Sequence, residues 1–357
     1  MLLDGILPPI TTPFYPDGNV YFKKLESNVE RYSRTPISGI VVLGSTGEAI
    51  MLSDQERRDV LKCARQAAAP TKVLVAGTGI ESAVETLRLT EYAAEVGYDV
   101  AMVRTPHYFK KQMLPANMLA FYRTVADRSP LPVMIYNFPQ AMGYDIPAEV
   151  VVELAEHPNL IGIKESSGDI AKVRRMVEGT RHIKRNATVT ETFEAVTPRM
   201  LAAATSGGGD GGELVPVGVL AGNADAKASA SAVTLVGNLK TRQKEVAFQV
   251  LVGAAHQLQP SLDAGAVGAI LAFACPSPTA CYEIYAAWKE GDADLARLKQ
   301  QRIAHAAQHV VADLGVPGVK HAMDFNGYYG GPSRLPLLPL TADLKSEIER
   351  GLADIRN

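Results

Sequence analysis

The sequence predicts an α/β fold, a (β/α)8 (TIM) barrel with extra C-terminal helices and an insertion before the seventh strand. Short β-branched runs that end in Gly, Pro or polar residues recur eight times along the 357 residues. Stretches with apolar residues at helical spacing separate most of these runs, and strands that alternate with helices form a parallel sheet. Barrels of about 250 residues fold as one domain, so the chain can hold one barrel with additions.

The first six predicted strands follow one another at regular intervals. The eight runs occupy residues 5–14, 39–48, 72–79, 99–106, 132–139, 160–166, 247–253 and 265–274. Helical spacing predicts connecting helices over residues 23–32, 54–68, 82–96 and 115–127. Ser53, followed three residues later by Glu56, is typical of a helix N-terminus. The apolar stretch at 264–274 is too short to cross a bilayer, which takes about 20 residues.

One interval breaks the regular spacing. Ile161 and Phe248, in the sixth and seventh strands, are 87 residues apart, whereas one βα unit takes roughly 30. Gly, Ser and Ala dominate residues 206–213 and 224–232, a composition typical of a flexible segment. The chain therefore divides into strands 1–6 with their helices (1–183), a flexible insertion (184–242), strands 7–8 (243–278) and a C-terminal helical region (279–357). The insertion leaves from the face opposite the catalytic one, so we expect it to be dispensable for chemistry.

Composition argues against several kinds of partner. Lys plus Arg number 36 and Asp plus Glu 38, and the net charge of −2 gives no basic surface for nucleic acid or an anionic membrane. The 3 cysteines lack metal-binding spacing and His107 has no second ligand nearby in sequence, so we expect neither a disulfide framework nor a metal. The first residues show no targeting signal, which favours a cytoplasmic protein and leaves a mitochondrial one open.

Lys164 is the first candidate for chemistry. It follows the apolar run of the sixth strand in the sequence Gly-Ile-Lys-Glu-Ser, at the end where barrel enzymes carry their catalytic residues. Burial favours the neutral amine of a lysine, which is the nucleophile that forms an imine with a ketone. The strand pattern leaves equally open a lysine that has left the strand and is solvated in the loop.

Two tyrosines and a glycine-rich turn lie at the same predicted rim. Tyr136 closes the fifth strand and could transfer protons beside such a lysine, although a buried core tyrosine gives the same pattern. Tyr108 follows the fourth strand, and an exposed loop aromatic is its alternative. Ser45 and Thr46 follow the second strand in Gly-Ser-Thr-Gly-Glu, where hydroxyls and backbone amides could bind a carboxylate or form only a tight turn.

Together these motifs resemble the dihydrodipicolinate synthase and N-acetylneuraminate lyase superfamily, the class I pyruvate aldolases. The resemblance is carried by GSTGE at 44–48, TPHYF at 105–109, YNFP at 136–139 and GIKESSGD at 162–169, in this order and spacing. It covers residues 5–177 and 248–340. The resemblance implies a barrel enzyme that needs no cofactor and takes a small 2-oxo acid as its substrate.

The resemblance also implies a role for each candidate residue. Lys164 would form the Schiff base, Tyr136 would relay protons, and Ser45 and Thr46 would bind the pyruvate carboxylate. Tyr108 matches the tyrosine that reaches the site of a neighbouring subunit. If so, the protein is a homo-oligomer, a dimer or a tetramer.

Three further positions bear on the substrate. Gly253 matches the family glycine that lets the ligand lie against the backbone. Synthases that condense aspartate semialdehyde carry an arginine after the YN.P motif, and Ala141 stands here at that place; alanine cannot make the bidentate contact of a guanidinium with a carboxylate. Residues 129–139 and 314–337 look most like 4-hydroxy-2-oxoglutarate aldolases, in which Ser166 would help to bind the second carboxylate.

We therefore expect a carbon–carbon lyase that cleaves 4-hydroxy-2-oxoglutarate to pyruvate and glyoxylate. A dihydrodipicolinate synthase-like reaction, or cleavage of a 2-keto-3-deoxy sugar acid or N-acetylneuraminate, would use the same imine. A barrel that binds a 2-oxo acid without converting it is the alternative outside enzyme chemistry. The presence of both Lys164 and Tyr136 argues against that alternative.

Overall fold

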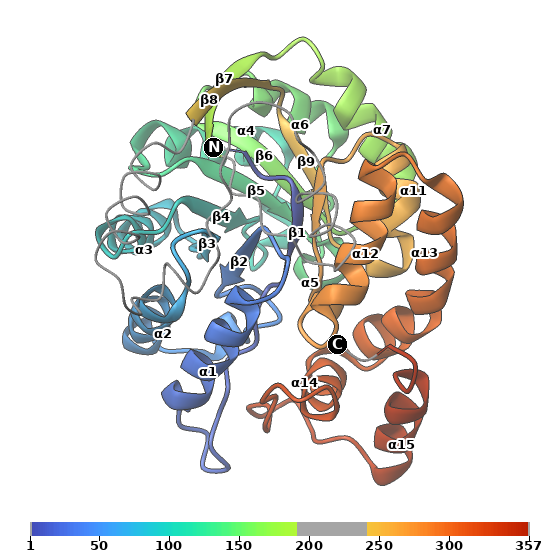
Figure 1. Ribbon diagram of the computed structural model, residues 1–357. Helices are drawn as coiled ribbons and strands as arrows, with labels where there is room; N and C mark the ends of the chain where they lie inside the picture. Colours follow the sequence, from blue (N-terminus) through green and yellow to red (C-terminus); the bar gives the residue numbers. More distant parts are fainter. Residues whose placement is uncertain (1, 191–240, 356–357) are drawn as a thin grey trace, which may run out of the picture. The chain divides into compact units, whose positions relative to one another are not determined.

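The computed structural model describes residues 2–190 and 241–355, and these residues contain the predicted barrel (Figure 1). Eight parallel strands form one sheet in the order β1-β10-β9-β6-β5-β4-β3-β2. They are β1 (Gly5–Leu7), β2 (Gly39–Val42), β3 (Val73–Gly77), β4 (Val100–Arg104), β5 (Val133–Asn137), β6 (Leu160–Glu165), β9 (Gln249–Val252) and β10 (Gly268–Ile270). Each strand falls within one of the eight predicted runs, which confirms the (β/α)8 fold.

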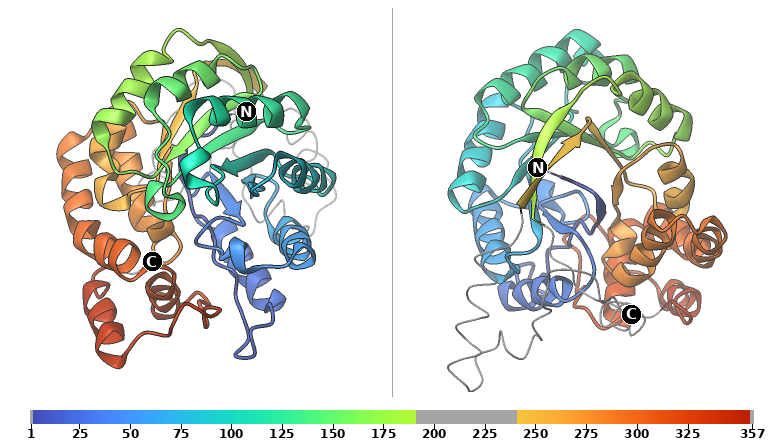
Figure 2. Two further views of the ribbon diagram at one scale, coloured as in Figure 1. Left: turned by 180° about the vertical axis from the view of Figure 1, so that it is seen from behind. Right: turned by 45° about the horizontal axis from the view of Figure 1, so that its top comes forward.

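The two ends of the sheet, β1 and β2, meet and close the barrel. Pro9 and Val41 form a parallel bridge. Backbone hydrogen bonds run from Val41 N to Pro8 O (3.0 Å) and from Ile10 N to Val41 O (2.9 Å). A closed parallel sheet has no edge strand, and the carboxyl ends of its strands surround a single opening. Figure 2 shows the strands inside a ring of helices.

Helices connect the strands and cover the outside of the sheet. They are α1 (Phe22–Ser33), α2 (Asp54–Ala67), α3 (Ala83–Glu95), α4 (Pro115–Arg128), α6 (Ala148–Ala155), α7 (Ile170–Gly179), α11 (Leu258–Asp263) and α12 (Pro278–Lys289). The predicted start of α2 is confirmed, because Ser53 Oγ accepts from Glu56 N (3.2 Å) and Glu56 Oε2 accepts from Ser53 N (2.9 Å). This capping box satisfies two amides that a helix N-terminus leaves free.

Alternation along the strands builds two apolar layers. Val41, Met102 and Leu251 belong to the cluster inside the barrel, whereas Ile40 and Ile135 belong to the cluster between the sheet and the helices. Successive residues of a strand face opposite sides, so the inward row is set by every second position. A polar side chain near the carboxyl end of an inward row therefore faces the mouth of the barrel.

The chain continues beyond the eighth strand and its helix. α13 (Ala293–Ala307) passes into a π-helical turn (Gln308–Asp313), and α14 (Gly315–Phe325) and α15 (Ala342–Gly351) follow (Figure 1). These elements confirm the extra C-terminal helices. At the predicted insertion, β7 (Arg185–Thr190) and β8 (Thr241–Val246) form a separate two-stranded sheet. The rest of that segment, residues 191–240, lies outside the described residues.

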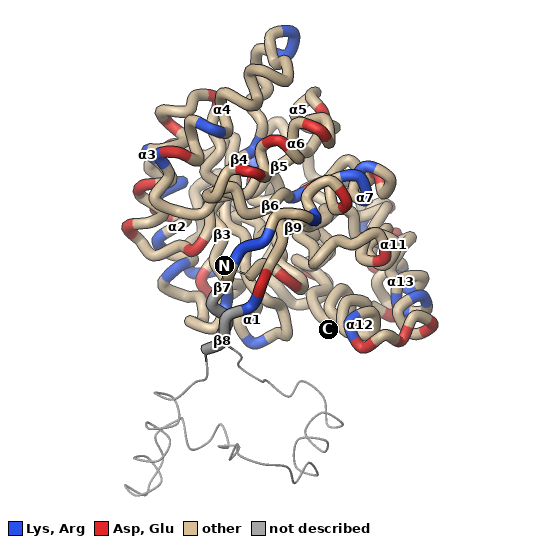
Figure 3. Tube along the Cα trace, turned by 90° about the horizontal axis from the view of Figure 1, so that it is seen from above, with Lys and Arg blue, Asp and Glu red and all other residues tan. Residues whose placement is uncertain are grey.

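The surface carries charges of both signs. In Figure 3, basic and acidic residues are interspersed over the helices, and neither sign covers a whole face in that view. Among the described residues, no helix is both long enough and apolar enough to span a membrane.

Candidate active site

Lys164 and Tyr136 lie side by side at the carboxyl end of the barrel. The sheet register pairs Tyr136 of β5 with Lys164 of β6, and each is the penultimate residue of its strand. Lys164 Nζ lies 4.2 Å from the centroid of the Tyr136 ring. The two residues are only 5% and 4% exposed. The structure therefore places this lysine inside the barrel mouth and not in solvent.

Lys164 differs from the other buried lysines in the described part of the chain. Lys72 donates to the backbone carbonyls of residues 35 and 37, Lys172 contacts two carboxylates, and Lys320 pairs with Glu48. By contrast, no carboxylate among the described residues lies within ion-pair distance of Lys164 Nζ. Within the described part of the chain, no carboxylate competes for this amino group, which leaves it available to a carbonyl carbon in the cavity.

A hydroxyl pair stands beside the lysine. Ser45 Oγ lies 3.2 Å from Tyr136 OH, and either oxygen can donate. Ser45 and the nearly buried Thr46 belong to the turn after β2, which begins at Leu43 with a positive φ of 62°. Gly77 of the neighbouring strand makes room for this turn, because a Cβ there would lie 2.2 Å from Leu43 O. The turn thus brings a second proton-carrying group to Tyr136.

Ser166 and Gly253 follow the neighbouring strands β6 and β9 and are in contact. Ser166 N donates to Asn137 O (3.0 Å), and Gly253 N donates to Glu165 O (2.8 Å), so both positions continue the sheet. A Cβ at residue 253 would lie 2.1 Å from Ser166 Oγ. Only glycine fits at this place without displacing the serine.

These residues line one cavity. Its volume is about 530 Å³, and its walls include Lys164, Tyr136, Ser45, Thr46, Ser166 and Gly253. Residues of α14 form another part of the wall, among them Val316 and Val319. The structure therefore brings together six of the seven site residues predicted from the sequence.

Tyr108 is the predicted residue that does not reach this cavity in the same chain. Its side chain is 75% exposed on the segment between β4 and α4. A second cavity of about 160 Å³ lies beyond the hydroxyl pair, since Ser45 and Tyr136 line it as well. His107 and Ala141 are among its other lining residues. Burial, followed by the charge of Arg104, lowers the pKa of His107.

A buried polar cluster behind Lys164 and Tyr136 was missed by the sequence reasoning. Asn137 Nδ2 donates to both carboxylate oxygens of Glu165 (3.0 Å each) and to Asp145 Oδ1 (2.8 Å). Lys172 Nζ lies 3.2 Å from Glu165 Oε2 and also contacts Asp145. Asn137 and Glu165 each come one position after a catalytic candidate, so they point to the opposite side of the sheet. The sequence did offer one signal for this cluster, because the consecutive apolar strands β5 and β6 end in the polar residues Asn137 and Glu165.

A carbonyl compound in the larger cavity would meet the Lys164 amino group and a pair of hydroxyl groups at once. This is the arrangement of an imine-forming barrel enzyme, a class I aldolase. The chain belongs to the dihydrodipicolinate synthetase family, because the model of that family matches residues 2–212 and 222–355. Enzymes of this family are carbon–carbon lyases, and the predicted superfamily and enzyme class are thereby confirmed.

Named relatives extend over most of the chain. The 4-hydroxy-tetrahydrodipicolinate synthase of Exiguobacterium sp. is 27% identical over 347 residues, which cover 97% of this chain and 96% of the relative. The synthase of Methanosarcina barkeri is 37% identical over 180 residues, covering 50% and 60%. The relatives named here are synthases, so the comparisons support the synthase-like alternative better than 4-hydroxy-2-oxoglutarate aldolase.

Solved structures share the fold over nearly the whole chain. The chloride-inhibited dihydrodipicolinate synthase of Acinetobacter baumannii, complexed with pyruvate, is 25% identical, covers 99% of both chains and gives a TM-score of 0.76. A prophage protein of E. coli K12 from the same family, also in complex with pyruvate, is 24% identical with 99% coverage of both chains and a TM-score of 0.76.

Proposed function

We propose that this chain is a Schiff-base-forming class I aldolase in which Lys164 attacks the C2 carbonyl of a pyruvate-type 2-oxo acid. The observation that carries the proposal is the buried amine without a carboxylate partner, 4.2 Å from the Tyr136 ring centroid. Two solved relatives were complexed with pyruvate, which supports the same ligand class here. The cavity has room for pyruvate together with a second small molecule.

The hydroxyl pair supplies the proton transfers that an imine needs. As Lys164 Nζ adds to C2, Tyr136 OH gives a proton to the former carbonyl oxygen. The proton that Lys164 Nζ loses on forming the carbinolamine passes to Tyr136 through Ser45 Oγ across the 3.2 Å contact, and Tyr136 then donates it to the C2 hydroxyl, which leaves as water and gives the protonated imine. Ser45 and Thr46, in the turn after β2, bind the carboxylate of the 2-oxo acid.

The imine then acts as an electron sink for the carbon–carbon bond. In the cleavage direction, Tyr136 accepts the proton of the C4 hydroxyl, the C3–C4 bond breaks, and its electron pair moves through C2 to the imine nitrogen. An aldehyde leaves and an enamine remains on Lys164. Protonation at C3 and addition of water at C2 release pyruvate and restore the amine.

The aldehyde partner has two candidates, each favoured by a different observation. The names of the relatives favour condensation with aspartate semialdehyde, the synthase reaction. Ala141, in the short helix α5 (Pro139–Met142), favours cleavage of 4-hydroxy-2-oxoglutarate to glyoxylate, because alanine offers no cation to the carboxylate of aspartate semialdehyde. Ser166 lines the cavity and would then contact the second carboxylate.

The test is to trap the imine with borohydride in the presence of pyruvate and to locate the reduced adduct by peptide mass spectrometry. We expect the adduct on Lys164, none in Lys164→Met, and an unchanged adduct in Lys289→Met, which alters an exposed lysine paired with Asp4. A folded wild-type protein without any adduct would favour the non-catalytic barrel. Pyruvate release from 4-hydroxy-2-oxoglutarate and pyruvate consumption with aspartate semialdehyde, measured side by side, then identify the aldehyde.

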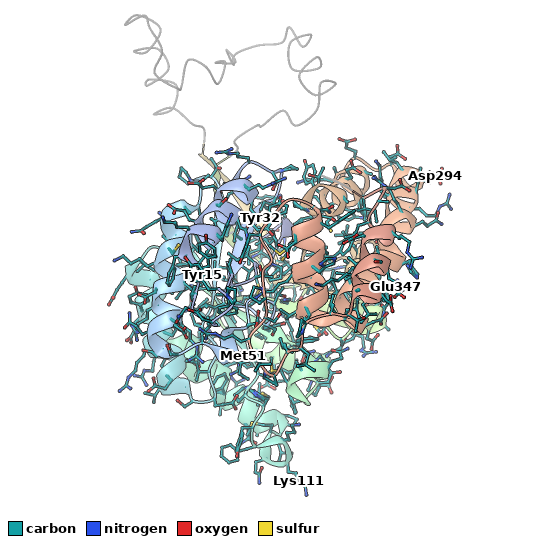
Figure 4. The ribbon with its side chains drawn as sticks, turned by 90° about the horizontal axis from the view of Figure 1, so that it is seen from below. Tyr15, Tyr32, Met51, Lys111, Asp294 and Glu347 are labelled. Atoms are coloured by element: carbon teal, nitrogen blue, oxygen red, sulfur yellow. The ribbon has the colours of Figure 1, made fainter. Side chains whose placement is uncertain are left out.

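Tyr108 is proposed to complete the site of a second copy of the chain. It is exposed next to Phe109, itself 61% exposed, on a segment that projects from the barrel, with Lys111 at its tip in Figure 4. The smaller cavity beside Ser45 and Tyr136 is the place where a phenol from another copy would meet the hydroxyl pair. We expect Tyr108→Ala to lower kcat, and mixing it with Lys164→Met to restore part of the activity. No recovery in mixed oligomers, shown to exchange by sedimentation, would contradict this role.

A further inference from the structure

The turn that carries Ser45 and Thr46 ends in a buried carboxylate. Glu48 adopts a left-handed backbone with φ of 54°, a conformation that non-glycine residues adopt only when their surroundings hold them. Its side chain is 1% exposed. Glu48 N donates to Ser45 O (3.0 Å), so the position of the glutamate is tied directly to that of the serine.

Both oxygens of Glu48 are bound by one distant segment, Lys320 to Arg334. Lys320 Nζ lies 2.6 Å from Glu48 Oε1, and the lysine side chain is also 1% exposed. Arg334 N donates to Glu48 Oε2 (2.9 Å). A buried charge is tolerated when it is paired, and here the Glu48 carboxylate has an ammonium beside one oxygen and a backbone N–H on the other.

The Lys320 ammonium is held by a carboxylate and by backbone carbonyl oxygens. Besides its ion pair with Glu48, the Lys320 ammonium donates to Thr12 O (2.9 Å) and Pro332 O (2.8 Å). The nitrogen lies 4.4 Å from the centroid of the Phe14 ring. Lys320 is therefore not a second nucleophile, although it is a buried lysine near the site.

The sequence Gly-Tyr-Tyr-Gly-Gly-Pro at residues 327–332 forms a loop that passes close to Lys320. A Cβ at Gly330 would lie 1.9 Å from Lys320 O, so this loop can pass close to α14 only with glycine at that position. Gly330 N donates to Asp324 Oδ1 (2.8 Å). At the end of the loop, the Arg334 guanidinium donates to Gly18 O and Met51 O (each 2.8 Å) and to Glu56.

We propose that the segment from Lys320 to Arg334 positions the carboxylate-binding turn, with Lys320 acting on Ser45 and Thr46 through Glu48. This inference rests on the proposed function. Lys320 is absent from the cavity lining, whereas Val319, its neighbour on α14, lines it. Loss of the ammonium leaves the Glu48 carboxylate buried beside carbonyl oxygens, and the left-handed turn then relaxes away from Tyr136. Lys320 is a positioning residue for pyruvate binding.

The experiment measures the pyruvate concentration that gives half-maximal borohydride adduct on Lys164. We expect Lys320→Met to raise it at least tenfold while the adduct at saturating pyruvate stays within twofold of wild type. Lys320→Met combined with Glu48→Gln removes both charges and restores most of the affinity, which a merely structural loss would not do. Lys289→Met, an exposed lysine on α12, is the matched control and shows the wild-type value.

Two results would overturn the inference. The first is a folded Lys320→Met with a lower melting temperature and an unchanged half-saturation for pyruvate. The second is a double variant no better than the single one. If Lys320→Met does not fold, Glu48→Gln alone decides the question, with a raised half-saturation supporting the role and an unchanged one contradicting it. A wild type that forms no adduct refutes the proposed function. The positioning role is then tested separately by measuring amide hydrogen exchange of residues 44–48. Faster exchange in Lys320→Met than in the wild type supports the role, and an unchanged rate contradicts it.

Discussion

Tyr136 contacts both Lys164 and Ser45 and lies between the two cavities of the site. Its ring lies under Lys164 Nζ, its hydroxyl meets Ser45 Oγ, and it lines both cavities. One phenol can therefore serve the reacting carbon and a proton chain at the same time. The β5 register fixes this position, because a shift by one residue would turn the tyrosine to the helix side of the sheet.

Tyr136→Phe tests this double contact. The variant keeps the ring and loses the hydroxyl, so we expect kcat to fall by roughly 10²–10⁴-fold, the range for one general acid–base group. Lys164 still faces the cavity, and prolonged incubation with pyruvate and borohydride should still label it. The measurement is steady-state kcat beside the labelling rate. A variant with wild-type kcat would show that another group transfers the proton.

The two strand ends that carry Lys164 and Tyr136 are joined by a polar cluster on the helix side of the sheet. Asn137 and Glu165 are register partners on β5 and β6, and Lys172 of α7 binds the same carboxylate from the helix layer. The Glu165 side chain is 1% exposed and that of Lys172 4%. This cluster fixes β6 against β5 and α7, and thereby the spacing of Lys164 and Tyr136 one residue earlier.

Lys172→Met tests this cluster. It leaves the Glu165 carboxylate buried without its cation, which costs roughly 3–5 kcal/mol where a buried pair is broken. We expect the low end of that range, because Asn137 still donates to both oxygens. Urea unfolding followed by circular dichroism gives the free energy, and Lys172→Met with Glu165→Gln should recover part of it. A loss below about 1 kcal/mol, the value of an exposed pair, would mean that the cluster does not stabilise the strand ends.

At the scale of the whole molecule, local pattern was enough for the barrel, whereas the site also needed the resemblance to a known family. All eight strands lie within β-branched runs such as 39–48 and 160–166. The strand pattern made Lys164 and Tyr136 candidates, and the family resemblance assigned their roles. The partners of Glu48 could not be found in this way. Lys320 reaches it from α14, and no spacing rule relates two side chains that only the closed barrel brings together. For Tyr108, the sequence offered an exposed loop aromatic as the alternative, and within one chain the side chain is exposed.

The insertion is the part of the whole chain whose removal we expect to matter least. Residues 3–185 together with those from 246 onward form one compact unit, and every residue that lines the larger cavity belongs to it. β7 and β8 pair with each other in a sheet of their own. A deletion of residues 191–240, with Thr190 joined to Thr241 by a short Gly-Ser linker, also shortens the connection, which lowers the entropic cost of closing it by about 1 kcal/mol or more.

We therefore expect the deletion variant to fold with an unchanged or higher melting temperature and to form the pyruvate adduct on Lys164 at the wild-type half-saturation. Calorimetry and borohydride trapping on the same preparation measure both. The matched control replaces residues 191–240 by a Gly-Ser segment of equal length, which separates the effect of sequence from that of length. A deletion variant that folds without forming the adduct would show that the insertion contributes to the site, and the barrel alone would then not be the catalytic unit.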